Sequence, residues 1–414
     1  EKACASGSTS LPAPDLPPGA GPAVSPNPML PTVSTPPQSD AASAFGREAA
    51  PGLLFTPGPV MLDEETLEGG RDQMVYHRTS DHAARLLRCE EGLKAACGAE
   101  SGARVLMLTA SGTGAMEATL INLFDVSDKV IVVNSGECGN RFVEICRLHG
   151  ITVREVRLEP GRALREEDLA QVDSAGCAGL VLAHHETSTG SLHDLELAGR
   201  FCRGRGLILV VDAIGSFLAD PVRQAACGID ALILSSQNGL ALPPGMSFVV
   251  VGRLAAERAR HVPCRSYYFA FARYLAEGQR GQTPFTPAVG ILRQLEARLK
   301  RILARGVDRV VADTAALAAD FRSRISAMPF RILPERPSSA VTALQALDGR
   351  GPQHYVRRLA EGHRLYVSAS PGALGQRVFR VSHLGDLSAE DNAQLARALA
   401  EISRSATRPG FTLS

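Results

Sequence analysis

The sequence predicts an α/β fold built on a mostly parallel sheet, followed by a smaller α+β domain. Three observations lead to this prediction. Short apolar runs recur through the middle of the chain, amphipathic segments separate them, and the pattern changes after about residue 290. Apolar runs that alternate with helical segments are typical of the buried strands of a parallel sheet.

Six apolar runs are the candidate strands: Arg104–Leu108, Lys129–Val133, Gly179–Ala183, Leu207–Val211, Ala231–Leu234 and Phe248–Val251. Between them lie stretches with helical periodicity, which include Gly114–Phe124, Arg141–His149 and Leu195–Arg205. In open parallel sheets, ligands bind beyond the carboxyl ends of the strands. We therefore expect the functional residues directly after the apolar runs.

Three regions are expected along the chain. Residues 1–52 hold 11 of the 26 prolines and few large apolar side chains, which predicts a disordered linker. Residues 53–305 are expected to form the large domain, and residues 306–414 the small C-terminal one. The pattern predicts a long helix at Val289–Ala304, a strand at Val378–Val381 and a last helix at Ala389–Arg404.

Composition excludes several classes of function. The formal net charge is +1, so no electrostatic surface for nucleic acid or for an anionic membrane is predicted. No apolar run approaches the roughly 20 residues that span a bilayer. The nine cysteines are scattered and show no CxxC spacing, which indicates the free thiols of a cytoplasmic protein rather than disulfides or a zinc site.

Two candidate ligand-binding segments follow predicted strands. In the first, the small turn Ser111-Gly112-Thr113 offers backbone amides and a helix N-terminus, which favour a phosphate. A strand-to-helix turn without a ligand fits this pattern equally well. In the second, Asp212 follows five aliphatic residues. A carboxylate there can keep a pyridinium nitrogen protonated, although a helix N-cap is the commoner role for such an aspartate.

Two further polar segments also follow predicted strands. His184 and His185 are adjacent, and neighbouring residues of a strand point to opposite faces, so no metal site is expected from this pair. The lining of a polar pocket and a simple polar turn are the two interpretations. The second segment, Ser235–Gly245, ends in a rigid Pro-Pro-Gly turn.

In their order and spacing, these four segments resemble class V aminotransferases of the alanine–glyoxylate and 2-aminoethylphosphonate branch. The resemblance also includes Leu53–Val60, Tyr76–Thr79, Gly281–Pro287 and Phe379–Gly385, so it extends over nearly the whole expected ordered chain. It implies a fold-type I pyridoxal-phosphate transferase with a seven-stranded, mostly parallel sheet in the large cofactor-binding domain. It also implies pyridoxal or pyridoxamine 5'-phosphate as cofactor, a homodimer, and a small anionic amino or keto substrate.

The resemblance assigns roles to the residues that match the family's phosphate site. Ser111, Gly112 and Thr113 would hold the cofactor phosphate, with Gln237 alongside. Thr283 matches a position that reaches the phosphate bound in the partner subunit. A homodimer with shared cofactor sites is therefore expected.

Three further roles concern the cofactor ring and the substrate. Asp212 would pair with the pyridine nitrogen, and Thr187 would approach the ring hydroxyl or the substrate. Arg380 would bind the carboxylate or phosphonate of the substrate through its planar, bidentate guanidinium group. Arg380 alone does not distinguish the two anions, whereas the stretches Leu240–Gly245 and Gln282–Pro287 are most similar to the 2-aminoethylphosphonate branch.

Two positions depart from the family's pattern. Asn238 stands where the family has the Schiff-base lysine, and Cys138 stands where the family has an aromatic residue stacked on the pyridine ring. An asparagine amide is neither nucleophilic nor basic near neutral pH, so it cannot hold the cofactor covalently or move a proton. The 44 basic residues include only four lysines, at positions 2, 94, 129 and 300, and none of these is expected near the cleft.

Three functional hypotheses follow from these departures. In the first, the protein binds the cofactor noncovalently and performs lysine-independent chemistry, with His184, His185 or Cys138 as the base. In the second, the protein is a non-catalytic dimer. In the third, it is an ordinary transaminase in which Asn238 is an engineered or miscalled residue.

Overall fold

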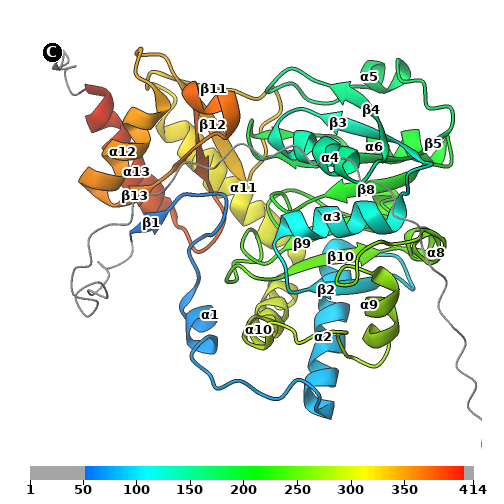
Figure 1. The fold of residues 1–414 in the computed structure, drawn as a ribbon. Helices are drawn as coiled ribbons and strands as arrows, with labels where there is room; N and C mark the ends of the chain where they lie inside the picture. Colours follow the sequence, from blue (N-terminus) through cyan, green and yellow to red (C-terminus); the bar gives the residue numbers. More distant parts are fainter. Residues whose placement is uncertain (1–51, 405–414) are drawn as a thin grey trace, which may run out of the picture. The chain divides into compact units, whose positions relative to one another are not determined.

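A central sheet of seven strands organises the described part of the chain, residues 52–404 of a computed structural model (Figure 1). The predicted linker, residues 1–52, lies outside the described residues except for Gly52. The order of the strands is β2-β10-β9-β8-β5-β3-β4. Their bounds are β2 Arg104–Leu108, β3 Lys129–Asn134, β4 Thr152–Arg157, β5 Cys177–Ala183, β8 Ile208–Asp212, β9 Ala231–Ser235 and β10 Ser247–Val251.

The sheet is mostly parallel, as predicted. The neighbouring strands β9, β8, β5, β3 and β4 pair in parallel, whereas β10 runs antiparallel to both β2 and β9. All six predicted strands are present. Strand β4 was not predicted, because charged residues alternate with its valines and it lies at the edge of the sheet with one buried residue.

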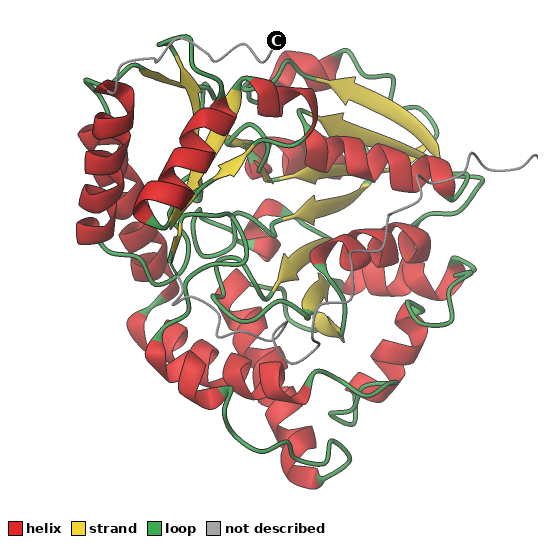
Figure 2. Ribbon diagram, turned by 60° about the vertical axis from the view of Figure 1, so that its left-hand side comes forward, coloured by secondary structure: helices red, strands yellow, loops and turns green. Residues whose placement is uncertain are grey.

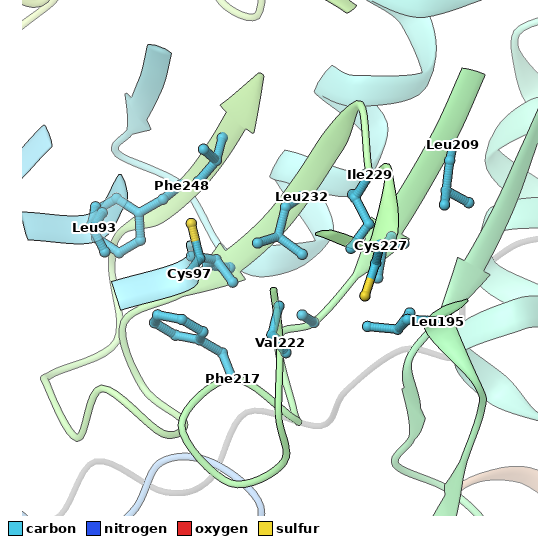
Figure 3. Close-up of a cluster of buried hydrophobic side chains, with 14 of the residues drawn as sticks. Leu93, Cys97, Leu195, Leu209, Phe217, Val222, Cys227, Ile229, Leu232 and Phe248 are labelled. Carbon is cyan, nitrogen blue, oxygen red and sulfur yellow. The ribbon is translucent and has the colours of Figure 1, made fainter. Parts of the chain in front are cut away.

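Helices cover both faces of this sheet (Figure 2). Successive strand residues point to opposite faces, so fully buried Leu209 and Val210 belong to two separate hydrophobic clusters. Figure 3 shows part of the first cluster, in which Leu93 lies near Phe248. The helices in contact with the sheet are α2 Ser80–Cys97, α3 Gly112–Leu123, α4 Glu137–Leu148, α6 Leu195–Arg203, α8 Arg253–His261 and α9 Phe271–Gly278.

A second, antiparallel sheet follows in the C-terminal part of the chain, with the order β11-β12-β15-β14. Its own hydrophobic cluster includes Phe321, Tyr355 and Phe379. The predicted division into domains at residues 305 and 306 falls between two helices and stays a prediction. The elements are β11 Phe330–Ile332, β12 Val341–Ala346, β14 Ser368–Ala369, β15 Val378–Ser382, α10 Val289–Arg305, α11 Val307–Arg324, α12 Pro352–His363 and α13 Ala389–Arg404.

Several short elements complete the described chain. Strand β1 pairs in parallel with β13, which attaches the first described residues to the C-terminal part. Among residues 52–404, no helix is both long and apolar enough to span a bilayer. The remaining elements are β1 Leu53–Leu54, α1 Glu64–Gly69, α5 Glu166–Ala170, β6 His185–Glu186, β7 Ser191–Leu192, α7 Gln224–Cys227, β13 Leu365–Tyr366 and the 3-10 helix Gly372–Gln376.

Candidate cofactor site

A cavity of about 340 Å³ lies where the carboxyl ends of β2, β8 and β9 meet the start of α4 and strand β15. Segments that are far apart in the sequence line this cavity, as expected for a site at this edge of a parallel sheet. Nine of the residues singled out from the sequence line it: Ser111, Gly112, Thr113, Cys138, Thr187, Asp212, Gln237, Asn238 and Arg380.

Three of the residues singled out, His184, His185 and Thr283, do not line the cavity. His185 lies behind its wall, because a Cβ atom added to Gly215 would be 2.6 Å from the Nδ1 atom of His185. Thr283 donates its hydroxyl to the carbonyl of Phe285 at 2.7 Å, and its own carbonyl accepts from Arg78. The buried His185 ring therefore supports the wall, and Thr283 lies elsewhere in the chain.

The carboxyl group of Asp212 is at the end of β8 and is almost fully buried. It accepts a hydrogen bond from the amide of Ile214 at 2.8 Å, and it has no ion pair within residues 52–404. Burial raises the pKa of Asp212 to about 7, and the nearby charge of Glu186 adds to the rise. Its hydrogen bond to Ile214 and the charge of Arg141 oppose the shift. Asp212 is thus a buried acid that faces the cavity without a cationic partner.

The N-terminus of α3 forms another wall of the cavity. Ser111 caps the helix and accepts a hydrogen bond from the amide of Gly114. A Cβ atom at Gly112 would lie 2.5 Å from Cδ1 of Ile214, so glycine permits this close approach. Arg141 donates to the hydroxyl of Thr113 at 3.4 Å and has no carboxylate partner in the described part of the chain. This wall therefore carries free amides and a positive charge, a combination that attracts anions.

The start of α4 is fixed by Glu186 rather than by a capping side chain of its own. Gly136 precedes the helix and makes no side-chain cap. The buried carboxylate of Glu186 accepts hydrogen bonds from the amides of Cys138 and Gly139 and from the hydroxyl of Ser188 at 2.6 Å. A negative charge at a helix N-terminus is favourable. Glu186 thereby sets the position of Cys138 at the cavity.

The side chain of Asn238 is buried, and both of its polar ends are used. Its Oδ1 atom accepts from the hydroxyl of Ser235, and its Nδ2 atom donates to the carbonyl of Pro57, each at 2.7 Å. Asn238 is only 7% exposed. It therefore joins the end of β9 to a segment near the start of the described chain.

Arg380 extends from β15 into the cavity. Its two terminal nitrogens donate to the backbone carbonyls of Thr187 and Ala369, whereas its buried Nε atom has no hydrogen-bond partner. Burial lowers the pKa of Arg380. No acidic side chain of residues 52–404 forms an ion pair with this guanidinium group, so an anion is still required to balance its charge.

Comparison with known proteins agrees with this architecture. Residues 62–369 match the model of the family described as aminotransferase class-V. The chain belongs to this family. Class V aminotransferases and the similar solved structures are fold-type I enzymes that depend on pyridoxal or pyridoxamine phosphate, so the predicted fold class is confirmed.

Several relatives within the class V family are similar over most of their length. A soluble hydrogenase 42 kDa subunit of Anabaena cylindrica is 30% identical, over 82% of this chain and 90% of the relative. An L-aspartate–glyoxylate aminotransferase of Paracoccus denitrificans is 28% identical, over 81% of this chain and 86% of the relative.

Two solved structures extend the comparison. The aspartate aminotransferase of subgroup IV from Thermus thermophilus is 32% identical, with a TM-score of 0.79, over 84% of this chain and 98% of that chain. The alanine–glyoxylate aminotransferase from a Nostoc species is 25% identical, with a TM-score of 0.83, over 87% of this chain and 97% of that one.

In this class V chain, no lysine of residues 52–404 lines the cavity. Lys94 lies on α2 and forms an ion pair with Glu91. Lys129 is the exposed first residue of β3, at the amino end of that strand, and Lys300 lies on the helix α10. No group of acidic, histidine or cysteine side chains in the described chain is arranged to hold a metal ion.

Sequence reasoning assigned no role to several residues of the site. Glu186 and Arg141 lie inside segments that the motifs covered, but only the fold shows that they meet Cys138 and Thr113. The segment Thr56–Gly58 also lines the cavity. The signal that could have found Glu186 was an acidic residue between polar ones directly after a buried strand.

Proposed function

We propose that this chain binds pyridoxal or pyridoxamine 5'-phosphate noncovalently and acts on a small anionic amino substrate, an amino acid or an aminophosphonate. When bound, this cofactor supplies an electron-withdrawing pyridine ring that stabilises negative charge on the substrate carbon. The observation that carries the proposal is the buried carboxyl group of Asp212, which faces the cavity without a cationic partner in residues 52–404.

A protonated pyridine nitrogen fits the surroundings of Asp212. Burial holds the pKa of this carboxyl group at about 7, far above its usual value of 3.8. A cation beside a buried carboxylate lowers its pKa and offsets the unfavourable desolvation of its charge. In this role Asp212 keeps a proton on the ring nitrogen.

The N-terminus of α3 fits the cofactor phosphate. Ser111, Gly112 and Thr113 offer backbone amides and hydroxyls at a helix start, and Gln237 lines the same cavity. Arg141 adds a charge that no carboxylate of the described chain neutralises. A dianionic phosphate matches this set of donors.

Arg380 fits the anionic group of the substrate. The residue is half-buried and its buried Nε atom is unpartnered, whereas its terminal nitrogens are held by the carbonyls of Thr187 and Ala369. These two hydrogen bonds fix the orientation of the guanidinium plane. A carboxylate or a phosphonate can then bind it with charge-assisted hydrogen bonds.

Noncovalent binding is proposed because the resemblance puts Asn238 at the position of the family's lysine. The supporting observations are its position beside Gln237 in the cavity wall and the absence of a lining lysine in residues 52–404. Without a tethering amine, the affinity for the cofactor depends on Asp212, the α3 N-terminus and Arg141.

The groups available for proton transfer favour a second candidate function, a non-catalytic protein that binds the same ligand. Burial lowers the pKa of His185 to about 3 and raises the pKa of Cys138 well above its usual range. The imidazole is then a weak base and the thiol stays protonated near neutral pH. His184 is bonded to Ser216 and lies outside the cavity.

A homodimer is part of the proposal. Thr283 does not line the cavity of its own subunit, which agrees with a role at a partner's cofactor site. Arg78 contacts Thr283, and two large apolar side chains shortly before Arg78 are exposed. Met74 is 63% exposed and Tyr76 is 68% exposed. Sedimentation of the full chain tests this directly, and a monomer at micromolar concentration would contradict it.

A titration with both cofactor forms tests the proposed function. Pyridoxamine phosphate is followed by its fluorescence and pyridoxal phosphate by its absorbance, in the wild-type chain and in Asp212→Asn. We expect saturable binding that the substitution weakens about a hundredfold, because it removes a charged partner. Equal affinities of the two proteins would assign the binding to another place.

The two candidate functions differ in turnover. With pyridoxamine phosphate bound, an enzyme converts keto acids or their phosphonate counterparts into amino products, whereas a binding protein does not. Incubation of the loaded chain with a panel of keto substrates, followed by amine analysis, separates them. Product above the level of free cofactor favours the enzyme, and product at that level favours the binding protein.

A further inference from the structure

The segment Thr56–Pro59, here called the strap, forms part of the wall of the cavity. Thr56, Pro57 and Gly58 line it. The hydroxyl of Thr56 donates to the carbonyl of Pro59 at 2.6 Å, which closes the strap into a compact turn. A ligand in the cavity therefore contacts a segment that is more than 150 residues away in sequence from Asn238.

Both ends of the strap are anchored in the C-terminal part of the chain. The amide of Phe55 donates to the carbonyl of Tyr366, and the carbonyl of Phe55 accepts from the amide of Ser382, each at 2.8 Å. After the strap, the amide of Asp386 donates to the carbonyl of Met61 at 3.0 Å. The ends of the strap are thus held independently of β9.

The middle of the strap is held by Asn238. The Nδ2 atom of Asn238 donates to the carbonyl of Pro57, while its Oδ1 atom accepts from Ser235 at the end of β9. The contact is close, because a Cβ atom at Gly58 would lie 3.0 Å from Nδ2 of Asn238 and 3.1 Å from the carbonyl of Gln237. One amide therefore joins the strap to the central sheet.

The bond to Pro57 requires a donor at position 238, and an ionised aspartate has no hydrogen to give. The Oδ1 atom of Asn238 accepts from the hydroxyl of Ser235, an interaction that a lysine, which has donors only, could replace only by donating to that hydroxyl instead. Asparagine is short enough to make both bonds from a buried position, where it is 7% exposed. The residue at position 238 has a defined structural task.

We infer that Asn238 is a positioning residue that latches the strap against β9 and so keeps a noncovalent ligand in the cavity. The inference rests on the proposed function for the identity of that ligand, and on geometry alone for the latch. In this proposal the strap, held closed by Asn238, retains the ligand in place of a covalent bond. Removal of the latch speeds the dissociation of the ligand more than it slows association.

Hydrogen exchange of the full chain, without added cofactor, tests the latch. We expect the peptide that spans residues 53–61 to take up deuterium about tenfold faster in Asn238→Ala and Asn238→Asp, because each loses a buried hydrogen bond. Asn140→Ala is the matched control, since it removes a side-chain amide that is hydrogen-bonded to Glu144 on the surface of the same helix, α4. Unchanged uptake in both Asn238 variants would overturn the inference.

Stopped-flow dissociation of pyridoxamine phosphate gives the second readout. The rate constant for dissociation should rise about tenfold in Asn238→Asp, and the Asn140→Ala protein should match the wild type. If Asn238→Ala does not fold, the nearly isosteric Asn238→Asp decides both measurements. Absence of pyridoxamine phosphate binding in the wild type would refute the proposed function, while the exchange experiment would still decide the latch.

Discussion

The carboxylate of Glu186 accepts a hydrogen bond from the backbone amide of Cys138 through each of its oxygens, at 3.1 and 3.2 Å. This contact links the short strand β6 to the first residues of α4. It places a negative charge at a helix start and fixes one wall of the cavity. The same charge contributes to the raised pKa of Asp212.

Glu186→Gln should therefore change both stability and ligand affinity. A glutamine side chain has one oxygen that accepts and one NH2 group that only donates. At least one backbone amide of α4 that now donates to Glu186 would therefore lose its acceptor. We expect the free energy of unfolding in urea to fall by about 2 kcal/mol. Glu144→Gln is the control, because Glu144 accepts from Asn140 on the exposed side of the same helix. Equal losses in the two variants would contradict the role given to Glu186.

The pKa of Asp212 predicts a pH dependence of stability in the cofactor-free protein. Burial raises this pKa from 3.8 to about 7, so the folded state binds more protons than the unfolded state between these values. The contribution of Asp212 is most favourable below about pH 4 and is lost as the pH rises through about 7. Asp212→Asn should remove this slope and be more stable than the wild type at pH 8.

The measurement is the free energy of unfolding from pH 4 to pH 8, in the wild type, in Asp212→Asn and in Asp308→Asn. Asp308 is exposed and pairs with Arg223 at the surface, so its substitution should leave the slope unchanged. Parallel curves for wild type and Asp212→Asn would show that this carboxyl group titrates normally. The expected gain in stability would accompany a loss of cofactor affinity, as is common at functional sites.

An alanine at Gly112 should weaken cofactor binding, and a second substitution at Ile214 should partly suppress that effect. An alanine there brings its Cβ atom within 2.5 Å of Cδ1 of Ile214, so the turn must move away from its phosphate-binding position. We expect Gly112→Ala to weaken pyridoxamine phosphate binding at least about tenfold. Shortening the neighbour in Gly112→Ala/Ile214→Val removes the 2.5 Å contact and leaves the Cβ atom 3.2 Å from the position of Cγ1, so it should restore part of the affinity. No recovery in the double variant would mean that the steric explanation is wrong.

Arg380 should affect the substrate anion and leave the cofactor alone. Arg380→Gln removes the charge, and Arg380→Lys keeps a charge but loses the planar pair of donors. We expect both variants to weaken the binding of 2-aminoethylphosphonate and alanine to the cofactor-loaded protein by at least about tenfold. The affinity for pyridoxamine phosphate should stay within about twofold. A parallel loss of cofactor affinity would place Arg380 at the phosphate instead.

Much of this fold could be predicted, because the buried strands are short apolar runs; Asp212 ends one of them, and Asn238 lies in the turn after another. The antiparallel direction of β10 could not, since a run such as Phe248–Val251 is equally apolar in either direction. Strand β4 was not predicted, because half of its residues are charged and it lies at an edge of the sheet. Local patterns describe faces and ends of elements, and they leave the pairing of elements open.

The site was predictable as a set of residues but not as a set of contacts. Nine of the residues singled out line one cavity, which follows from their common place at strand ends. The bond from Asn238 to Pro57 joins segments that no local pattern relates. The same holds for Glu186 and Cys138, which lie 48 residues apart.

Restoring a lysine tests whether Asn238 occupies the tethering position. Asn238→Lys, incubated with pyridoxal phosphate and reduced with borohydride, should gain the mass of one bound cofactor, whereas Asn140→Lys should not. No gain would mean that position 238 does not face the aldehyde carbon. Full transaminase activity of Asn238→Lys would favour an ordinary transaminase whose lysine has been replaced, and resequencing of the natural gene would then decide the matter.

The central claim is that the cavity holds the phosphorylated pyridine without a covalent bond. The most direct measurement is to saturate the wild-type chain with pyridoxal phosphate, treat it with borohydride, and compare the bound cofactor before denaturation with the intact mass after it. The account predicts about one cofactor retained per native chain and an unmodified mass. A covalent adduct on a cavity residue, or no retained cofactor in either form, would contradict it.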